Sequence, residues 1–530
     1  MTETHGSPNA DADVIVVGQG VVGQVLSLLL AQRGHRVVAL ERHAEPYSMP
    51  RAVHYDPDVN RLLDGLGIDA AEQATFSEPA LSYDWLSADR QLLLTFPNAL
   101  EGDQGWPDST MFAQPDLEAA LRARQAEHPN LEIRWGTELT AIHDDGRQVT
   151  ATVVGPEGES TLSAAYLVGC DGANSTVREL VGITVDDLGF SSDWLVMDLK
   201  MPPRDWFPVN GQICDPQRPT SCVSGGPGRR RFEFMLMPGD DLATFATPET
   251  AWRLVEPWNL TPADAELERL AMYTFHAHCA TQWRVGRTFI AGDAAHRMPP
   301  FFGRGMVSGV RDAMNLAWKL DHVLRGVAGP ALLDTYFSER YAHVQFALMM
   351  SVELGRIICE TDPQKVAARD AHLLETGPSP QNAMPPMPPE LLGPGFFGGA
   401  PGEDAVAGRI GVQGRLRGGD GSEVLADRIS WGEFVAFVDA RRVTEAEAER
   451  IRAAKPDAVA CKVIEVVPAG EEPRNRHSGV DLDGRYLAAF EQSGALAIVM
   501  RPDLHGFGAA TTVEDAVALM AALGTMEDAA

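Results

Sequence analysis

The segment around Gly18 constrains the fold of this chain more than any other. Residues 13–18 (DVIVVG) form a short β-branched run that ends in glycine, which predicts a buried strand. Residues 21–33 follow with helix-forming side chains, and Gly34 provides a helix stop. Residues 35–41 (HRVVALE) predict a second strand. The chain therefore begins its fold with a β-α-β unit.

The turn between the first strand and the helix has a defined glycine spacing. Gly18, Gly20 and Gly23 fit the pattern G-x-G-x-x-G, in which the glycines allow a tight turn, close approach of a pyrophosphate, and close helix packing. Glu41 ends the next strand, 18 residues after Gly23, where a carboxylate can accept hydrogen bonds from ribose hydroxyls and repel a 2′-phosphate. This context favours a dinucleotide site for FAD or NAD over a chance glycine turn.

Length and composition limit the remaining architecture. A chain of 530 residues exceeds a single core, and its formal charge of −30 argues against nucleic-acid phosphate and anionic membranes as partners. Six widely spaced cysteines show no CxxC or zinc spacing and are interpreted as reduced thiols. Residues 1–11 show no targeting signal, and we expect a cytoplasmic protein.

Two further segments extend the dinucleotide hypothesis. Residues 170–178 (CDGANSTVR) follow a short apolar run, and residues 287–309 (RTFIAGDAAHRMPPFFGRGMVSG) contain a predicted last strand at 288–291. Together with the glycine pattern they resemble the three fingerprints of the flavin-dependent aromatic hydroxylases, the para-hydroxybenzoate hydroxylase family. The resemblance implies that Asp293 binds the ribityl chain of FAD. It also implies that Asp171 and Gly172 serve FAD and NAD(P)H binding.

The resemblance, with the predicted elements, gives a fold expectation of the α/β class. A Rossmann-like FAD-binding domain of the GR2 type (residues 12–80, 110–189 and 280–345) is interleaved with a mixed, mostly antiparallel substrate-binding sheet (81–109 and 190–279). A helical connection (346–375) and a Pro/Gly-rich surface linker without regular elements (376–403) follow. Residues 404–530 resemble a thioredoxin-like domain, but no CxxC accompanies them.

Several other residues match cofactor positions of the family. These predicted FAD contacts are Arg42, Arg51, Gln114, Pro300, Gly303, Gly305 and Met306. Three of the predicted contacts have a plainer alternative: a surface salt bridge for Arg51, and helix capping for Gln114 and Asp293. The helix predicted from Met306 would direct its N-terminal dipole at the flavin. His296 is expected to belong to the cofactor motif and not to act as a general base.

Within the family, the chain most resembles 3-(3-hydroxyphenyl)propionate hydroxylases, which implies a monooxygenase that uses FAD, NADH or NADPH, and O₂. The phenol would be hydroxylated through a C4a-hydroperoxyflavin. His54, Tyr273 and His276 are candidate acceptors for the phenolic proton, each with a purely structural alternative. Arg304 replaces the usual glutamine and Val307 the usual asparagine, so Arg304 could alter the flavin or meet an acidic substrate.

Substrate contacts are expected on the loop that contains Pro299 and Phe301 and on the predicted antiparallel sheet. We assign Arg218, Pro299 and Phe301 to substrate binding, while the run Arg229–Arg231 fits either anion attraction or, more commonly, a solvated hairpin. The expected substrate is an aromatic acid of the 3-(3-hydroxyphenyl)propionate type. A larger polycyclic phenol and a catalytically silent flavin-binding protein are the alternatives. We expect no metal, no nucleic acid, no membrane, and a monomer or homodimer.

Overall fold

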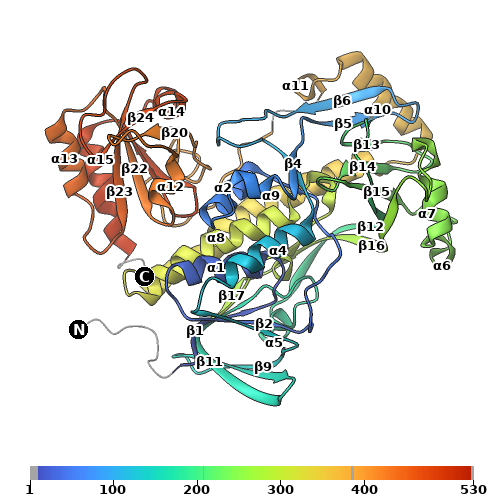
Figure 1. Ribbon diagram of the computed structural model, residues 1–530, viewed down its shortest axis with the longest axis horizontal. Coiled ribbons are helices and arrows are strands. Elements are labelled where there is room, and N and C mark those ends of the chain that lie inside the picture. Colours follow the sequence, from blue (N-terminus) through green and yellow to red (C-terminus); the bar gives the residue numbers. More distant parts are fainter. Residues whose placement is uncertain (1–9, 207, 384–386, 527–530) are drawn as a thin grey trace.

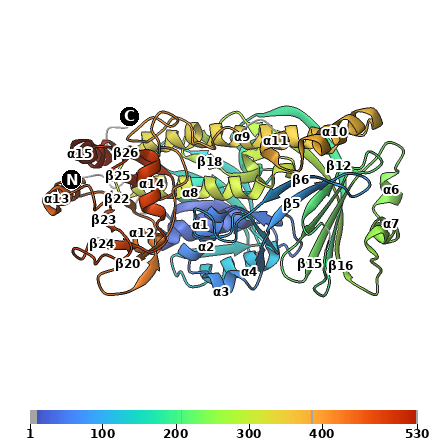
Figure 2. The ribbon, with the colours of Figure 1, turned by 90° about the horizontal axis from the view of Figure 1, so that it is seen from above.

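Four sheets and a central pair of helices organise the protein. The computed structural model describes residues 10–206, 208–383 and 387–526. The glycine-rich start of the chain, the long central helices and a separate C-terminal unit are distinguishable in Figure 1, and Figure 2 shows the C-terminal unit at the opposite end from the β12–β16 sheet.

The first sheet confirms the predicted β-α-β start. Strand β1 (Ala12–Val17) runs parallel to β2 (Val37–Glu41) and to the end of β11 (Gly158–Gly169). The remaining members of this sheet are β8 (Leu131–Trp135), β9 (Glu138–Asp144), β10 (Val149–Gly155), β17 (Arg284–Val285) and β18 (Thr288–Ile290). Helix α1 (Val21–Gln32) is buried along most of its length because helices α4 (Gln114–Gln125) and α8 (Gly305–Leu324) pack against it.

The second sheet forms a mostly antiparallel wall, and most of its strands lie within the ranges 81–109 and 190–279 where such a sheet is predicted. Its strand order is β19-β16-β12-β15-β14-β13-β5-β6, with one parallel pair between β13 and β5. The bounds are β5 (Ser82–Leu86), β6 (Leu92–Pro97), β12 (Val185–Lys200), β13 (Gly211–Ile213), β14 (Thr220–Ser224), β15 (Arg229–Met235), β16 (Glu266–Ala280) and β19 (His296–Arg297). Phe232 and Phe234 lie on one face, in a core with Trp258.

Short elements connect this wall to the first sheet. A small sheet contains β3 (His54–Tyr55), β4 (Ser77–Pro79) and β7 (Thr110–Phe112). The short helices are α2 (Pro57–Gly65), α3 (Ala70–Gln73), α5 (Thr176–Leu180), α6 (Leu242–Phe245) and α7 (Pro248–Leu254). The 3-10 turns are η1 (Glu256–Trp258), η2 (Gly292–Ala294), η3 (Pro300–Phe302) and η4 (Pro330–Asp334). Helix α9 (Thr335–Ile358) packs on α8 and η3, and α10 (Pro363–Thr376) follows it.

The Pro/Gly-rich segment departs from the expected surface linker. A short helix α11 (Pro380–Ala383) lies within it, and Leu392 and Phe396 are buried. Glu390 in this segment forms ion pairs with arginines of the α8 region. Residues 384–386 lie outside the described part of the chain. The segment is thus partly integrated into the core, because its few apolar side chains fill positions beside α9.

The C-terminal unit is built on a seven-stranded sheet. Its order is β21-β20-β24-β23-β22-β25-β26. The strands are β20 (Arg415–Arg417), β21 (Glu423–Leu425), β22 (Phe434–Asp439), β23 (Cys461–Val467), β24 (Ser478–Asp481), β25 (Ala497–Met500) and β26 (Gly506–Ala510). The helices are α12 (Ala426–Ser430), α13 (Glu445–Ala453), α14 (Arg485–Ser493), α15 (Val513–Ala521) and the turn η5 (Ala522–Met526).

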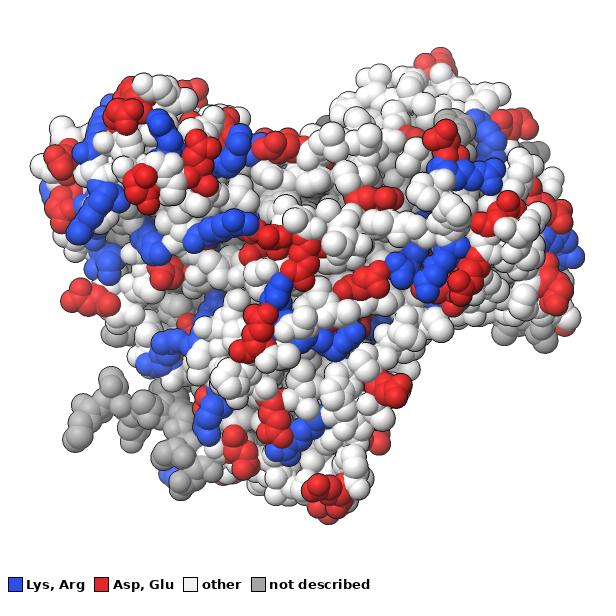
Figure 3. Space-filling view, viewed as in Figure 1, with Lys and Arg blue, Asp and Glu red and all other residues white. Residues whose placement is uncertain are grey.

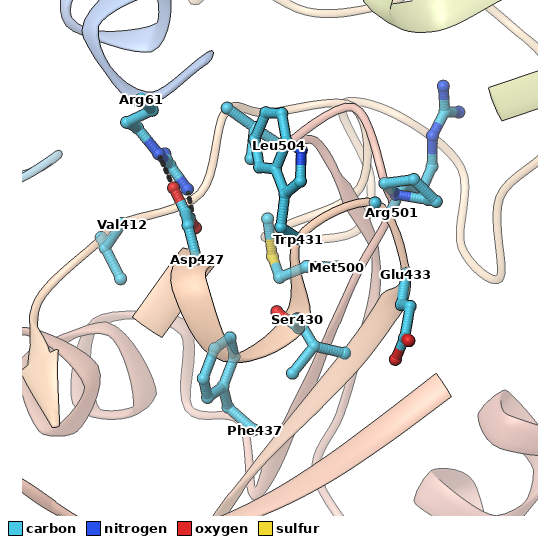
Figure 4. A pocket seen from close by; sticks show the side chains of 13 residues that line it. Arg61, Val412, Asp427, Ser430, Trp431, Glu433, Phe437, Met500, Arg501 and Leu504 are labelled. Atoms are coloured by element: carbon cyan, nitrogen blue, oxygen red, sulfur yellow. Dashed lines mark hydrogen bonds and ion pairs between the residues drawn. The ribbon is translucent and has the colours of Figure 1, made fainter. Parts of the chain in front are cut away.

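Buried charges join this unit to the central helices. Arg501 donates to the carboxylates of Asp503 (2.6 Å) and Glu339 of α9 (2.7 Å), and Lys319 of α8 donates to Glu339 (2.8 Å). A second contact, on the wall of a small pocket, pairs Arg61 of α2 with Asp427 of α12 at 2.7 Å (Figure 4). Arg428 with Asp64 and Arg485 with Glu101 add further ion pairs, so the C-terminal unit is anchored at several charged positions.

Three properties concern the surface and composition of the described residues. Acidic and basic side chains are interspersed over the face shown in Figure 3. The six cysteines are unpaired thiols, and no group of three potential metal ligands is found among the described residues. No single described helix is long and apolar enough to cross a membrane, although the bent pair Pro330–Ile358 and Pro363–Thr376 meets that test by length and composition only.

Candidate active site

The three sequence motifs meet at one edge of the first sheet. Val17 of β1 is in register with Gly169 of β11, and Gly169 is in register with Ile290 of β18. Because these strands are parallel, the segments that follow them leave the sheet on the same side. The turn at Gly18, the segment at Asp171 and the segment at Asp293 are thus brought together from sequence positions far apart.

The glycine turn has the geometry that its spacing predicts. Gly18 has a φ of 96°, in the left-handed region, and a Cβ at Gly23 would overlap the carbonyl oxygen of Gly18. A Cβ at Gly20 would meet only the Arg51 guanidinium, at 3.4 Å. Helix α1 has Gly20 at its N-cap, so it has no side-chain cap, and its first turn contains no acidic residue. Its N-terminal N–H groups are therefore available to an anion.

Glu41 supports the glycine turn. Its carboxylate accepts hydrogen bonds from the backbone N–H groups of Gln19 (2.9 Å) and His43 (3.0 Å). Arg42, beside it, is exposed. The glycine turn therefore already orients the Glu41 carboxylate, which is the group predicted to contact the ribose.

Arg51 is held by a buried glutamine. The amide oxygen of Gln114 accepts from the backbone N–H groups of Arg51 (3.1 Å) and Ala52 (2.6 Å), and its nitrogen donates to Glu118 (2.7 Å). The Arg51 side chain is 47% exposed and lies 3.3 Å from Glu118. Gln114 therefore positions the segment that presents Arg51, and the salt-bridge and anion-binding interpretations of Arg51 are compatible.

The Asp-Gly segment is fixed by its own side chains. Asp171 accepts from the Ser175 hydroxyl (2.5 Å) and the Val177 backbone N–H (3.0 Å), and burial raises the pKa of its carboxyl. Gly172 has a φ of 81°. Arg178 donates to the carbonyls of Ala173 (3.0 Å) and Ala294 (2.9 Å). Arg178 thus ties the second motif to the third.

The Gly-Asp segment presents an exposed carboxylate. Asp293 has no hydrogen bond or ion pair with any other described residue, and it lines a small pocket with Arg178, His278 and Arg297. It does not cap a long helix, because η2 contains it and α8 begins only at Gly305. The Asp293 carboxylate is free to meet a polyol.

A buried ion-pair network lies directly behind this segment. Asp312 of α8 accepts from the Gly292 backbone N–H (3.0 Å), from His296 Nε2 (2.7 Å) and from Arg340 (2.8 Å). The side chains of His296, Asp312 and Arg340 are fully buried. His296 therefore orients the cofactor motif and is remote from solvent, which supports the interpretation that it is no general base.

The loop of residues 299–306 places backbone and aromatic groups opposite the wall. Buried Pro299 accepts a hydrogen bond from Ser351 (2.7 Å) at its carbonyl oxygen, whereas Pro300 is exposed. Gly303 has a φ of 68°. Gly305 and Met306 open helix α8, which has no side-chain cap at its start. The N-terminus of α8 therefore follows directly on the loop that contains Gly303.

His54 lies against that loop. Its Nδ1 is 3.3 Å from the Gly303 carbonyl oxygen and its Nε2 is 2.9 Å from the Ser109 hydroxyl. Burial lowers the pKa of His54, so its imidazole is neutral at pH 7. Of the three predicted proton acceptors, His54 is the one in contact with the glycine loop.

Tyr273 and His276 lie on opposite faces of β16. Tyr273 stacks on Phe275, and Phe275 contacts Phe301 at 6.1 Å between ring centroids. Strand alternation directs His276 to the other face, where its ring stacks on His278 at 5.0 Å. Only Tyr273 therefore shares the aromatic surface around Phe301.

Arg304 is neutralised by two carboxylates. Its guanidinium lies 2.9 Å from Asp56 and 2.8 Å from Glu390, and the neighbouring Arg311 contacts both of these and Asp58. Val307 is buried. The positive charge expected beside the flavin is thus compensated, and Glu390, which supplies half of the compensation, comes from the proline-rich segment.

The predicted substrate-side arginines are all engaged. Arg218 pairs with Asp240 (2.8 Å) and donates to the Met235 carbonyl. The solvated-hairpin interpretation is wrong for Arg230 and Arg231, which are 2% and 3% exposed. Arg231 pairs with Asp198 at 2.7 Å, and Arg229 pairs with Asp116 at 2.8 Å. Segments that pass over the two faces of β15 bury Arg230 and Arg231: Arg230 donates to the carbonyls of Pro208 and Val209, and Arg231 donates to those of Pro50 and Arg51.

The functional side chains that sequence reasoning missed are Arg178, Asp312 and Glu390. Arg178 stood inside the quoted second motif, and its spacing from Asp171 was the available signal. Asp312 lay in a predicted amphipathic helix, where a charge at a buried position was a detectable anomaly. Glu390 gave no local signal, because its partners are about 80 residues away in sequence.

The residues present fit FAD. The space in front of Gly20, the uncapped start of α1 and the half-exposed Arg51 suit a pyrophosphate. The uncapped start of α8 suits a flavin, and the Asp293 carboxylate, which is unpaired among the described residues, suits a polyol chain.

Comparison with known proteins gives a consistent result. A family model described as "FAD binding domain" matches residues 11–351. The chain is 36% identical over 514 residues to the "Probable NADH-specific resorcinol 4-hydroxylase" of Rhodococcus jostii (strain RHA1), covering 96% of this chain and 94% of that protein. It is 34% identical over 431 residues to a 3-(3-hydroxy-phenyl)propionate/3-hydroxycinnamic acid hydroxylase of Mycolicibacterium smegmatis, covering 80% and 76%.

Solved structures show the same fold. Aklavinone-11 hydroxylase, solved with FAD and aklavinone, superposes with a TM-score of 0.76 at 24% identity, covering 98% of this chain and 100% of that one. The p-nitrophenol 4-monooxygenase from Pseudomonas putida DLL-E4 gives a TM-score of 0.62 at 28% identity, covering 69% and 93%. The first likeness concerns the fold alone.

Proposed function

The chain belongs to the FAD-binding family of flavin-dependent hydroxylases, and from this premise we propose that it hydroxylates a small phenol with NADH and O₂. The observation that carries the proposal is the end-to-end likeness to a protein named as an NADH-specific resorcinol hydroxylase. The meeting of the three motifs at one sheet edge supports it. The phenol would be of a type named for the relatives, a resorcinol or a 3-(3-hydroxyphenyl)propionate-type acid.

We assign the binding of FAD to groups that the fold already presents. The N-terminus of α1 and Arg51 would hold the pyrophosphate, and Glu41 would accept hydrogen bonds from a ribose. Asp293 would hold the ribityl chain, and the N-terminus of α8 would stabilise negative charge on the flavin. When bound, FAD supplies the hydride acceptance and oxygen activation on which the hydroxylation depends.

The substrate would lie between the loop of residues 299–303 and the aromatic face of the wall. Trp194, Phe275 and Phe301 contact one another at 5.6–6.2 Å between centroids, which supports a site that orients a planar ring and excludes water. Neutral His54 would receive a proton at Nε2 through the Ser109 hydroxyl, which would pass its own proton to that nitrogen and take the proton of the phenol in exchange. Pro299 and Arg218 would act indirectly, by fixing the loop and the strand.

The domain limits predicted from the sequence stay part of the proposal. The first sheet, the antiparallel wall and the C-terminal sheet support three units at about the expected boundaries. In the last unit, β22, α13 and β23 form a parallel β-α-β unit flanked by antiparallel β25 and β26, which supports a thioredoxin-like fold. The thiol of Cys461 has a raised pKa, about 12, owing to burial, so a redox role is not proposed. Cytoplasmic location and a monomeric or homodimeric state stay predictions.

Steady-state turnover tests the proposed function. Purified protein loaded with FAD would be mixed with NADH, O₂ and a panel containing resorcinol, 3-(3-hydroxyphenyl)propionate and one polycyclic phenol. We expect NADH and O₂ consumption to rise with one of the small phenols, and an equivalent amount of hydroxylated product to form. Stimulation by the polycyclic phenol alone would favour a tailoring hydroxylase. Bound FAD without stimulation by any phenol would contradict the proposal.

A further inference from the structure

A buried carboxyl group lies on the antiparallel wall, outside the residues assigned so far. Glu233 of β15 is directly opposite Ser221 of β14 and Val196 of β12. Residues directly opposite each other in a sheet point to the same face, as do residues two apart in one strand. Glu233 therefore shares its face with Arg231, Met235 and Ser221.

The partners of the two neighbours show which way this face points. Arg231 donates to the backbone carbonyls of Pro50 and Arg51, in the segment that presents Arg51 to the glycine turn. Met235 belongs to the apolar cluster that contains Phe275 and Phe301. Glu233 lies between these two residues on the strand, so it faces the cofactor-binding side. Phe232 and Phe234 fill the opposite face.

Glu233 is part of a polar group within apolar surroundings. The Ser221 hydroxyl donates to the amide oxygen of Gln212 (2.7 Å). The amide nitrogen of Gln212 is fully buried and has no hydrogen-bond partner among the described residues. Tyr83, which burial gives a raised pKa, packs both with the Phe301 cluster and with the cluster that contains Val53 and Met111. An unpaired buried donor beside a carboxyl group indicates a site for a polar ligand atom.

The charges on this face disfavour an anionic ligand. Arg231 is paired with Asp198, with both nitrogen–oxygen distances below 3 Å. Arg269 donates to the Pro50 carbonyl and stacks on Tyr273. Glu233 lies 3.8 Å from Arg231, and burial raises the pKa of its carboxyl. A substrate carboxylate would thus meet an acidic group and arginines that are already engaged.

We propose that Glu233 accepts a hydrogen bond from a hydroxyl group of the substrate, with the Gln212 amide as donor beside it, and so selects uncharged hydroxylated benzenes over aromatic carboxylates. The inference rests on the proposed phenol hydroxylation and identifies its substrate class. It favours the resorcinol type over the aromatic acid type, because two neutral hydroxyl groups can be satisfied by a carboxyl acceptor and an amide donor, whereas a carboxylate cannot.

Equilibrium binding of two phenols to FAD-loaded protein tests the assignment. Resorcinol and 3-(3-hydroxyphenyl)propionate would be titrated anaerobically, without NADH, into the natural protein and into E233Q, E233D and the control E266Q, with the flavin absorbance change as readout. Glu266 is an exposed residue at the start of β16 and matches the chemical change. Turnover with each phenol would give the corresponding kcat/KM ratios.

The natural protein should bind resorcinol more tightly than the acid. E233Q should weaken resorcinol binding about 10- to 100-fold, which is the loss typical of a hydrogen bond to a charged group. The preference for resorcinol over the aromatic acid should therefore become smaller or reverse. E233D should weaken resorcinol binding yet still reject the acid, and E266Q should change neither. FAD content and melting temperature identify any variant that is misfolded. If one Glu233 variant is misfolded, the other Glu233 variant tests the assignment.

Two results would overturn the assignment: tighter binding of the acid by the natural protein, or an unchanged preference in both Glu233 variants. Because the titration needs no turnover, it tests Glu233 even where no phenol stimulates NADH oxidation. That absence of stimulation would contradict the proposed function by itself. Turnover with an unchanged preference in both Glu233 variants would contradict the Glu233 assignment alone.

Discussion

His296 Nε2 lies 2.7 Å from the carboxylate of Asp312, and both side chains are fully buried behind the Gly-Asp segment. The same carboxylate holds the Gly292 backbone N–H and Arg340, so one aspartate of α8 links this motif to α9. His296 and Arg340 lower the pKa of Asp312, although burial opposes them. This linkage fixes the position of Asp293, whose free carboxylate is the proposed ribityl contact.

Removal of the Asp312 charge should destabilise the protein and release FAD. D312N leaves Arg340 buried without its carboxylate partner, and breaking such a pair costs about 3–5 kcal/mol. Denaturant unfolding would measure the free energy of unfolding, and the flavin-to-protein absorbance ratio would measure FAD content. D293N is the control, because it changes an exposed carboxylate: it should lower FAD affinity but leave the unfolding free energy within about 0.5 kcal/mol. Equal stability of D312N and the natural protein would refute the linkage.

Two glycine substitutions should separate cofactor binding from folding. In G20A the added methyl group meets only the flexible Arg51 side chain, so the protein should fold but bind FAD at least tenfold more weakly. In G23A the methyl group overlaps the Gly18 carbonyl, so soluble folded protein should be scarce. Circular dichroism and FAD titration check both. Normal FAD affinity in G20A would argue against pyrophosphate binding at this turn.

Stability should fall as the pH is lowered from 7 to 5, and His343 should account for part of that loss. Burial and the neighbouring Arg340 lower the pKa of His343 to about 3, so the folded state keeps it neutral. The unfolded chain binds this proton near pH 6.5, and it therefore binds more protons than the folded state between these values. The slope from this one group approaches about 1.4 kcal/mol per pH unit below pH 6.

The comparison of H343Q with the natural protein isolates this effect. Its unfolding free energy, measured at pH 7, 6 and 5, should depend less on pH than that of the natural protein. Other histidines with lowered pKa values, such as His54 and His322, are unchanged in the variant and leave a residual slope of the same sign. Identical slopes in the two proteins would show that His343 is protonated when folded.

The contact between the C-terminal unit and the central helices should contribute strongly to stability. R501L removes the buried partner of both Glu339 and Asp503 and should cost about 3–5 kcal/mol. R415L removes a half-exposed arginine that pairs with Asp483 inside the same unit, and it should cost less than about 1 kcal/mol. Denaturant unfolding compares the two. A similar small loss in both variants would contradict a strong interdomain contact.

Much of the fold could be predicted because local patterns specify it. The β-branched run before Gly18 and the glycine spacing define β1, the turn and α1 within one or two residues. Helix α8 begins at Gly305, one residue before its predicted start at Met306. The arginine run at 229–231 could not be interpreted locally, because Arg230 and Arg231 are buried by distant segments, residues 208–209 and 50–51.

The candidate site was predictable only in its backbone-determined part. Gly18, Gly20 and Gly23 act through conformation and close approach, which their spacing encodes. Arg304 was assigned a free positive charge, yet Asp56 and Glu390 neutralise it from distant parts of the chain. Glu233 gave no signal of its own, because a glutamate in an alternating strand is ordinarily solvent-facing.

The sequence by itself determined that this chain has a Rossmann-like start, three ordered cofactor motifs and an antiparallel region behind them, because glycine spacing and hydrophobic periodicity act over short distances. Tertiary structure alone decided which charges remain free. Parallel register brings Gly18, Asp171 and Asp293 to one edge, and it leaves Asp293 unpaired while Arg231 and Arg304 are compensated. Electrostatic interactions depend on separation in space, and residues far apart in sequence set that separation.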